Sequence, residues 1–390
     1  MPIKPYITKE ETYLTSLRRW FHMHPEPSSA EYETCKKITG ELDALGIPYQ
    51  LIGGTGITAV IRGEKPGKGK IIALRADMDA LSMDDLKQVP YASQNKGCCH
   101  ACGHDVHMAA LLGAAKVLQE KKVDFAGEVR LFFQPAEEIG GGAKFFIEAG
   151  LLDSVHRIFG AHVAPMLDSD SVAIVEGSRN ASCDYFRIDV KGRGAHAATP
   201  EKGVDALYAA TQIVNNLQSI VARNTAPGDA VLVAVGKLHA GTQYNILAEN
   251  ATLEGTTRAF TSESRRFTNE RVTRIAEETA NMFGATASVT CKAFAAPLIN
   301  DPAATREAHA VAASIFDEAH IHTNYEKALW ADDFAYFLEQ VQGVYVLIGT
   351  KDKHADHPPI PLHHGMFDVD ERALLTLCNL YVDFALSYMG

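Results

Sequence analysis

The run KIIALRADMDA, residues 70–80, joins a strand pattern to two aspartates at its carboxyl end. Similar apolar runs are GITAVIRG from Gly56 and EVRLFFQ from Glu128, and each of the three predicts a buried strand. The segment from about Val106 to Lys121 has the apolar spacing of a helix, with Ala, Leu and Val on its inner side. Strands that alternate with helices predict an α/β fold around a largely parallel or mixed sheet.

Polar residues gather where these strands end. Asp77 and Asp79 follow IIALR, Glu137 and Glu138 follow LFFQPA, and His162 closes the apolar run RIFGAH. Groups at strand ends and in the loops after them build the sites of α/β sheets, so we expect these side chains to converge. Taken alone, His162 also fits a core histidine whose ring is satisfied by a carbonyl.

The run HACGHDVH, residues 100–107, packs one thiol, three imidazoles and one carboxylate into eight residues. Imidazole and thiolate are ligands for zinc and its first-row neighbours, so the run indicates half of a metal site. Distant carboxylates or histidines would complete it.

The adjacent pair Glu137-Glu138 would be costly after an apolar strand unless a positive charge compensates it. One carboxylate on a metal and its neighbour free as a general base would explain the pair. The alternative is that the pair begins the next helix, because acidic residues favour a helix N-terminus.

The pattern changes near Ser182. From there the predicted elements follow the order β-α-β-β-α-β, which is the ferredoxin-like arrangement with two helices on one sheet face. We therefore expect residues 182–294 to form an inserted domain between 1–181 and 295–390.

Three polar residues of the insert and one histidine pair near the carboxyl end are further candidates for substrate binding or metal ligation. His196 lies among small residues in GRGAHAATP, as a substrate-facing imidazole would require. Asn245 and Arg258 are expected on the following strands, where either could bind a ligand carboxylate, although a surface salt bridge is the plainer interpretation of Arg258. Of His363 and His364 at most one is expected to bind a metal, and a solvated loop is the alternative.

Composition narrows the class of partner. At 390 residues the chain exceeds the size at which one core keeps growing, which favours two domains. A formal net charge of −11 disfavours binding to nucleic acid or to anionic membranes, so a small molecule is the expected partner. No secretory or membrane-spanning segment is evident, and seven scattered cysteines fit reduced thiols, so we expect a cytoplasmic protein.

The motifs, in this order, resemble those of the aminoacylase and carboxypeptidase metallopeptidase family. The similar branch is the amidohydrolases that include hippurate hydrolases, auxin-amino-acid conjugate hydrolases and N-acetyldiaminopimelate deacetylases. The resemblance covers nearly the whole chain, through HPEPSSAEYET, GTGITAVIRG, ALRADMDAL, HACGHDVH, LLGAAKVL, FFQPAEE, FGAHVAP, GRGAHAATP, GTTRAF, WADDFAYF and LHHGMFDVDE.

This resemblance implies a catalytic domain made of 1–181 and 295–390, with 182–294 as a lid and dimerisation domain. It implies two divalent metal ions, among Zn, Mn, Co and Ni, with the ligands Cys102, His104, Glu138, His162 and His363. The other implied roles are general base and proton donor for Glu137, oxyanion stabilisation for His196, substrate-carboxylate binding for Asn245 and Arg258, and orientation of the centre for Asp79.

The leading hypothesis is a metal-dependent amidohydrolase that cleaves small N-acyl amino acids and forms a homodimer, with His196 acting in its own subunit or in the partner subunit. One alternative is a binding or scaffold protein with a retired site, which the presence of Glu137 and His196 disfavours. Another is a cysteine-nucleophile amidase that attacks through Cys102. The segment Asn245–Glu249 lacks the proline usual in relatives, and His364-Gly365 also departs from the usual pattern, so we expect the substrate pocket to differ in shape from that of relatives.

Overall fold

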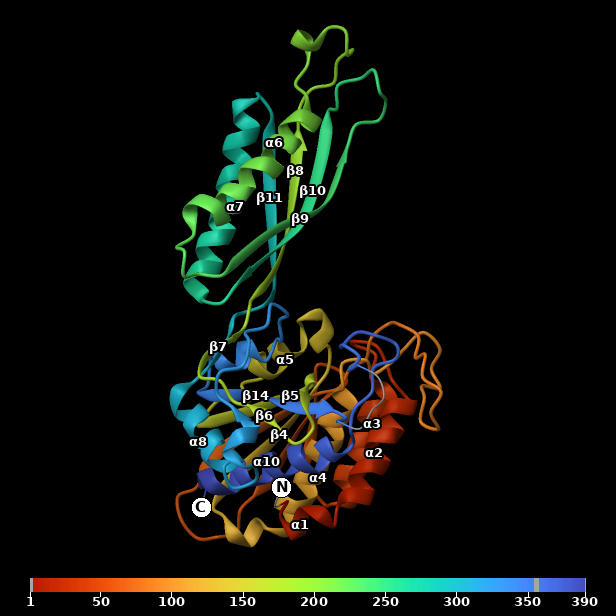
Figure 1. The fold of residues 1–390 in the computed structure, drawn as a ribbon, viewed down its shortest axis with the longest axis vertical. Helices are drawn as coiled ribbons and strands as arrows, with labels where there is room; N and C mark the ends of the chain where they lie inside the picture. Colours follow the sequence, from red (N-terminus) through yellow and green to blue (C-terminus); the bar gives the residue numbers. More distant parts are fainter. Residues whose placement is uncertain (1–2, 354–357, 390) are drawn as a thin grey trace. The chain divides into compact units, whose positions relative to one another are not determined.

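The computed structural model describes residues 3–353 and 358–389. The chain folds into two compact units (Figure 1). The first unit comprises Met1–Gly177, Asn300–Glu326 and Asp333–Gly390, and the second comprises Ser178–Ile299 and Lys327–Asp332. No helix within the described ranges is long and apolar enough to cross a membrane.

The first unit is built on a mixed sheet whose strands, in the described part of the chain, follow the order β1-β2-β4-β3-β5-β14-β6-β13. The central strands β4, β3, β5 and β14 run parallel, whereas β1, β2 and β4 pair antiparallel at one side. This confirms the predicted α/β class with a mixed sheet. The bounds are β1 Tyr49–Ile52, β2 Gly56–Arg62, β3 Lys70–Asp77, β4 Gly127–Gln134, β5 Arg157–Asp168, β6 Val172–Ala173, β13 Ile321–His322 and β14 Gly343–Lys351.

Helix α4, His104–Glu120, lies at the centre of the first unit. It packs against β3 and against the helices α2, Glu11–Met23, and α10, Arg372–Met389. Of its 17 residues, 14 are buried, so nearly all sides of the helix face the protein interior. The predicted inner side with Ala, Leu and Val is therefore only part of its buried surface. Gly113 allows the close approach of α2, because a Cβ there would lie 2.4 Å from Leu14 Cδ2.

The remaining α-helices of the first unit surround this core. They are α1 Pro5–Thr8, α3 Tyr32–Ala44, α5 Gly142–Glu148, α8 Pro302–Ala312 and α9 Ala335–Leu338. The core beneath them joins apolar residues of the sheet to those of α2, α4 and α10.

The second unit has the order β8-α6-β9-β10-α7-β11 and an antiparallel sheet ordered β11-β8-β10-β9. Both helices cover the same face of that sheet, where Ile213 of α6 and Val272 of α7 share a core with Phe186 and Leu253 (Figure 1). This confirms the predicted ferredoxin-like insert. The bounds are β8 Cys183–Lys191, α6 Ala206–Ser219, β9 Val231–Ala240, β10 Asn250–Ala259, α7 Ser262–Met282 and β11 Thr286–Ala295.

The chain passes between the units along two short strands that pair with each other. These are β7, Gly177–Asn180, and β12, Leu298–Asn300. Beside the segment 182–294, the second unit takes in residues 178–181, 295–299 and 327–332.

Candidate metal centre

The loop before α4 brings a thiol and an imidazole to the end of β3. Cys102 lies in this loop and His104 is the first residue of α4, and both are buried. Between them Gly103 has a φ of +83°, and a Cβ there would lie 2.3 Å from Val163 Cγ2. Only glycine meets both demands without strain, so this glycine lets the two side chains enter the same pocket.

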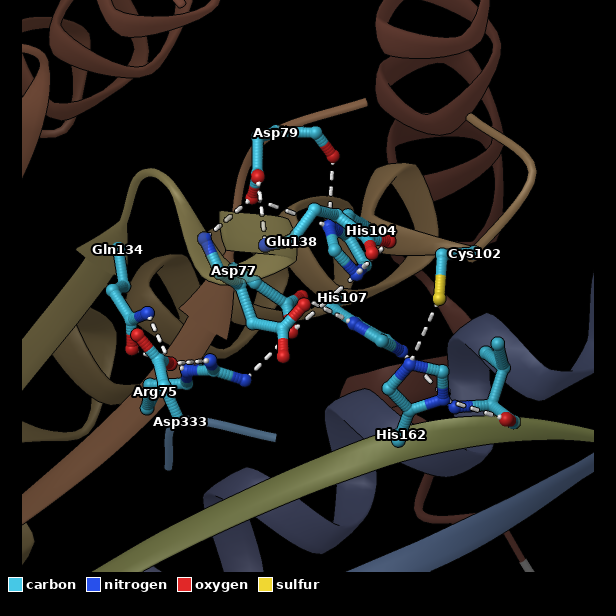
Figure 2. A network of polar contacts seen from close by, with 12 residues as sticks. Arg75, Asp77, Asp79, Cys102, His104, His107, Gln134, Glu138, His162 and Asp333 are labelled. Carbon is cyan, nitrogen blue, oxygen red and sulfur yellow. Dashed lines mark hydrogen bonds and ion pairs between the residues drawn. The ribbon is translucent and has the colours of Figure 1, made fainter. Parts of the chain in front are cut away.

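Backbone carbonyls fix the orientation of two histidine rings. His104 Nδ1 lies 2.7 Å from the carbonyl oxygen of Asp79, and His162 Nδ1 lies 2.8 Å from that of Val163 (Figure 2). Each Nδ1 therefore carries the proton and donates it, which turns Nε2 of each ring toward the pocket. There His162 Nε2 lies 3.3 Å from Cys102 Sγ.

Glu138 and His363 complete the group from two other loops. Glu138 Oε1 lies 3.8 Å from His104 Nε2 and 3.5 Å from His363 Nε2. His363 has a φ of +61°, an unusual value for a residue with a side chain, and its N–H donates to the carbonyl of Ala101 at 2.8 Å. This bond connects the loop of His363 to the HACGH segment. A positive φ at a residue with a side chain is a strained conformation, which is typical of functional positions.

The spacing of these atoms fits metal coordination. Ligand atoms about 2.1 Å from a tetrahedral metal lie roughly 3.4 Å from one another, close to the distances found here. Two of them, His104 Nε2 and Glu138 Oε1, are buried and have no hydrogen-bond partner among the described residues. The sets that could hold a cation include Cys102/His104/His162, Cys102/Glu138/His363 and His104/Glu137/Glu138. Cys102, His104 and Glu138 each belong to two of these sets, so the sets overlap in space.

The electrostatics of the ligands also favour a cation. Burial alone would lower the pKa of His104, but the carboxylates of Asp77, Asp79 and Glu138 raise it to about 10. Burial and the nearby Glu138 and Glu137 raise the pKa of the Cys102 thiol well above its usual range. Without metal, both ligand atoms therefore hold protons at neutral pH, and a divalent cation would displace them.

The Glu137-Glu138 pair opens a short 3₁₀ turn, η2 Glu137–Ile139, directly after β4. The carboxylate of Asp79 accepts the N–H of Glu137 at 3.1 Å and that of Glu138 at 3.0 Å, and it also accepts Ser28 Oγ at 2.6 Å. The two interpretations of the pair are thus compatible, because Glu138 reaches the metal group while both residues begin a helical turn. Glu137 is 5% exposed.

The second unit holds His196 and Asn245 side by side in two loops. Ile246 bridges His196, and the N–H of Ala197 donates to the carbonyl of Asn245 at 3.0 Å. The prediction that Asn245 lies on a strand was wrong: it lies in a turn before β10. The carbonyl of Asn245 and the N–H of Leu247 bond to Ala197 and Ala195 in the loop of His196, and the strand ladder with β8 begins only at Asn250.

Arg258 lies on β10 as predicted, opposite Leu232 of β9. The first unit thus carries all five expected ligands with Glu137 and Asp79, and the second carries His196, Asn245 and Arg258.

A buried polar network beneath the metal group was missed by the sequence analysis. His107 Nδ1 lies 2.5 Å from Asp77 Oδ1, and His107 Nε2 accepts the N–H of Val163 at 3.0 Å (Figure 2). Arg75 contacts Asp77 at 2.6 Å and Asp333 at 3.2 Å. Burial alone would raise the pKa of Asp77, but the positive neighbours hold it well below its usual range. The available signal was an arginine inside the apolar run KIIAL-R-AD.

Comparison with known proteins agrees with this geometry. The sequence profile of peptidase family M20/M25/M40 matches residues 73–387. The N-acetyl-L-cysteine deacetylase of Bacillus subtilis is 38% identical over 370 residues, which are 94% of this chain and 85% of that protein. The hippurate hydrolase of Campylobacter jejuni is 33% identical over 392 residues, with full coverage of both chains.

A solved structure gives the same result. The YXEP protein of Bacillus subtilis, described as a dinuclear metal binding peptidase from the M20 family, is 33% identical with a TM-score of 0.85. The match covers 98% of this chain and 99% of that one. The resemblance inferred from the motifs is confirmed, and the chain belongs to peptidase family M20/M25/M40.

Proposed function

We propose that this chain is a metal-dependent amidohydrolase that cleaves N-acyl amino acids into a carboxylate and a free amino acid. The observation that carries the proposal is the convergence of five ligand-type side chains beside Glu137, two of which present buried atoms with no hydrogen-bond partner among the described residues. The similar N-acetyl-L-cysteine deacetylase and hippurate hydrolase act on substrates of this class.

Two divalent ions, among Zn, Mn, Co and Ni, would be held by Cys102, His104, Glu138, His162 and His363. When bound, such ions polarise the amide carbonyl and lower the pKa of water. In both histidines Nδ1 donates to a carbonyl, which leaves Nε2 as the ligand atom, and a thiolate suits these metals better than it suits Mg²⁺ or Ca²⁺.

Glu137 would move the proton. Its carboxylate accepts a proton from water as the oxygen attacks the carbonyl carbon, and it delivers that proton to the amide nitrogen as the C–N bond breaks. One water is consumed, and the products are a carboxylate and an amine. Asp79 holds the backbone of Glu137 and Glu138 and so keeps the base and the ligand in fixed directions.

His196 would stabilise the oxyanion. Its Nδ1 accepts the N–H of Ala198 at 3.0 Å, so in the neutral ring the proton is on Nε2, which can donate to an oxygen. Asn245 and Arg258 would bind the substrate carboxylate, Arg258 through its bidentate fork.

A homodimer is part of the proposal. β9 is an edge strand of its sheet, so its outer backbone groups can pair with a second copy. Whether His196 acts within its own subunit or in the partner depends on that assembly.

A cavity of about 470 Å³ adjoins Glu138 and His363 and is the proposed site for the acyl group of the substrate. Its other lining residues are Pro27, Ser28, Ala80, Leu81, Ser82, Met83 and Ile139. The described lining combines two of the proposed metal ligands with mainly apolar side chains, so the cavity suits an uncharged apolar group that lies next to the metal centre. We assign the acyl chain to this cavity.

The test is hydrolysis of N-acetyl, N-benzoyl and longer N-acyl amino acids with each metal, for the wild type and for Glu137→Gln. Loss of a general base costs about 10²- to 10⁴-fold in rate, so E137Q should lose kcat by that factor and still bind two ions. Glu148→Gln, on the exposed end of α5, is the matched control and should keep full activity.

Two results would contradict the proposal. A fully active E137Q would remove the role of Glu137. Turnover that resists a chelator and stops irreversibly on thiol labelling would favour the Cys102 nucleophile instead, a chemistry disfavoured by the raised pKa of this buried thiol.

A further inference from the structure

The motif HPEPSSAEYET contains a buried carboxylate that the chemistry above does not use. Glu31 lies at the residue before α3 and is 0% exposed. A carboxylate is rarely buried in this way unless its hydrogen bonds are satisfied.

Three donors satisfy Glu31. Its Oε1 accepts the N–H of Ser29 at 2.8 Å and the N–H of Ala136 at 3.0 Å, and its Oε2 accepts Thr55 Oγ1 at 2.6 Å. The contact with Ala136 joins residues 105 positions apart in the sequence. It therefore links the N-terminal loop to the turn that carries Glu137.

Ala136 has an unusual backbone conformation. Its φ of +56° and ψ of +35° place it in the left-handed region, which residues with a Cβ seldom adopt. Such a conformation persists only where the surroundings hold it, and the Glu31 carboxylate bonds the N–H of this same residue.

Three successive backbone N–H groups then point at two buried carboxylates. Ala136 donates to Glu31, whereas Glu137 and Glu138 donate to Asp79. Glu31 holds the peptide group before Ala136 and Asp79 holds the one after it, so the two carboxylates together fix the rotation at Ala136 that sets where Glu137 and Glu138 point.

We propose that Glu31 is a positioning residue for the general base, which it orients by holding Ala136 in the left-handed conformation. Glu31 contacts neither substrate nor reacting atoms, and the inference rests on the proposed function of Glu137. Asp79 fixes the turn from one side and Glu31 fixes it from the other.

The variants follow from the hydrogen bonds. Glu31→Ala removes the acceptor and should lower kcat by roughly 10- to 100-fold, as is usual for partners one step removed from a metal centre, with little change in KM. Glu31→Gln should stay near wild type, because an amide oxygen can accept both N–H groups while the NH₂ donates to Thr55. Should E31A fail to fold, Glu31→Asp, one methylene shorter, tests the same contact.

A second substitution separates positioning from general support. Glycine adopts positive φ without strain, so Ala136→Gly in the E31A background should restore much of kcat while the lost stability is not restored. Glu10→Ala is the matched control, since Glu10 is also a buried carboxylate and pairs with Lys116 at 2.6 Å. It should lower the melting temperature and leave kcat at the wild-type value.

Amide hydrogen exchange gives a readout that needs neither metal nor substrate. In metal-free protein, the Ala136 amide should exchange faster in E31A than in wild type, and E10A should not change it. Wild-type kcat in E31A, an unchanged Ala136 exchange rate, or no recovery with A136G would overturn the inference. If wild type hydrolyses no N-acyl amino acid, the proposed function fails, and the exchange experiment still tests the contact.

Discussion

Replacing the buried Arg18 tests how much its ion pairs stabilise the part of the first unit around the metal centre. Its guanidinium is fully buried and contacts Asp105 at 2.9 Å, Asp368 at 2.6 Å and Glu371 at 3.3 Å. These contacts join α2 to α4 and to the segment that follows His363. Arg18→Met keeps most of the side-chain volume and removes the charge.

The magnitude follows from burial. The Asp105 side chain is 1% exposed, so without Arg18 its charge is left inside the protein beside His22 at 2.7 Å and the N–H of Val106 at 3.0 Å. Breaking a buried pair in this way costs about 3–5 kcal/mol. At about 2 °C per kcal/mol for a domain of this size, the melting temperature should fall by roughly 6–10 °C.

The pH dependence of unfolding should change in a defined direction. Burial would raise the pKa of Asp105, but Arg18 and His22 lower it below its usual range. Its stabilisation is complete above the unfolded pKa of about 4 and is lost as the pH falls through the lower folded pKa. In R18M the folded pKa rises, so acid unfolding should begin at a higher pH.

Calorimetry of R18M and of Arg19→Met between pH 3 and pH 8 measures both effects. Arg19 contacts the same Glu371 at 2.7 Å but is 46% exposed, so its loss should cost at most about 1 kcal/mol. Equal melting temperatures for R18M and R19M would refute the inference that the buried ion pairs of Arg18 strongly stabilise the first unit.

Two further predictions concern the centre itself. Met83→Trp should narrow the cavity beside Glu138 and reduce kcat/KM for N-benzoyl substrates at least about tenfold relative to N-acetyl substrates. The control Met282→Trp, in the second unit, should leave this ratio unchanged. An unchanged ratio in Met83→Trp would contradict the assignment of the acyl chain to this cavity. Because Cys102 and His104 hold protons without metal, metal affinity should rise with pH by tenfold or more per unit near neutrality, with proton release seen by titration calorimetry in two buffers. Affinity that is independent of pH would contradict this.

Much of the site could be predicted from the sequence, because its residues lie beside a glycine or directly after apolar strand patterns. Cys102 and His104 share a segment with Gly103, and Asp79 and Glu138 each follow an apolar strand. Parallel strands carry such residues to the same edge of a sheet, so β3, β4 and β5 bring them together.

Other features depend on contacts between distant segments. Nothing local predicts that Glu31 bonds Ala136, or that Arg18 meets Asp368, 350 positions later. The run NILAENATLEGTTRAF predicts a strand that starts at Asn245, whereas the carbonyl of Asn245 bonds to Ala197 in the loop of His196. Long-range hydrogen bonds of this kind have no periodic signal.

The most direct test of the central claim is a crystal structure of the chain grown with Mn²⁺ or Zn²⁺, with anomalous scattering recorded at the metal edge. We expect two anomalous peaks, both within about 2.0–2.4 Å of atoms from Cys102, His104, Glu138, His162 and His363, with the thiolate of Cys102 contacting at least one. Peaks elsewhere, or no bound metal in protein that hydrolyses N-acyl amino acids, would contradict it.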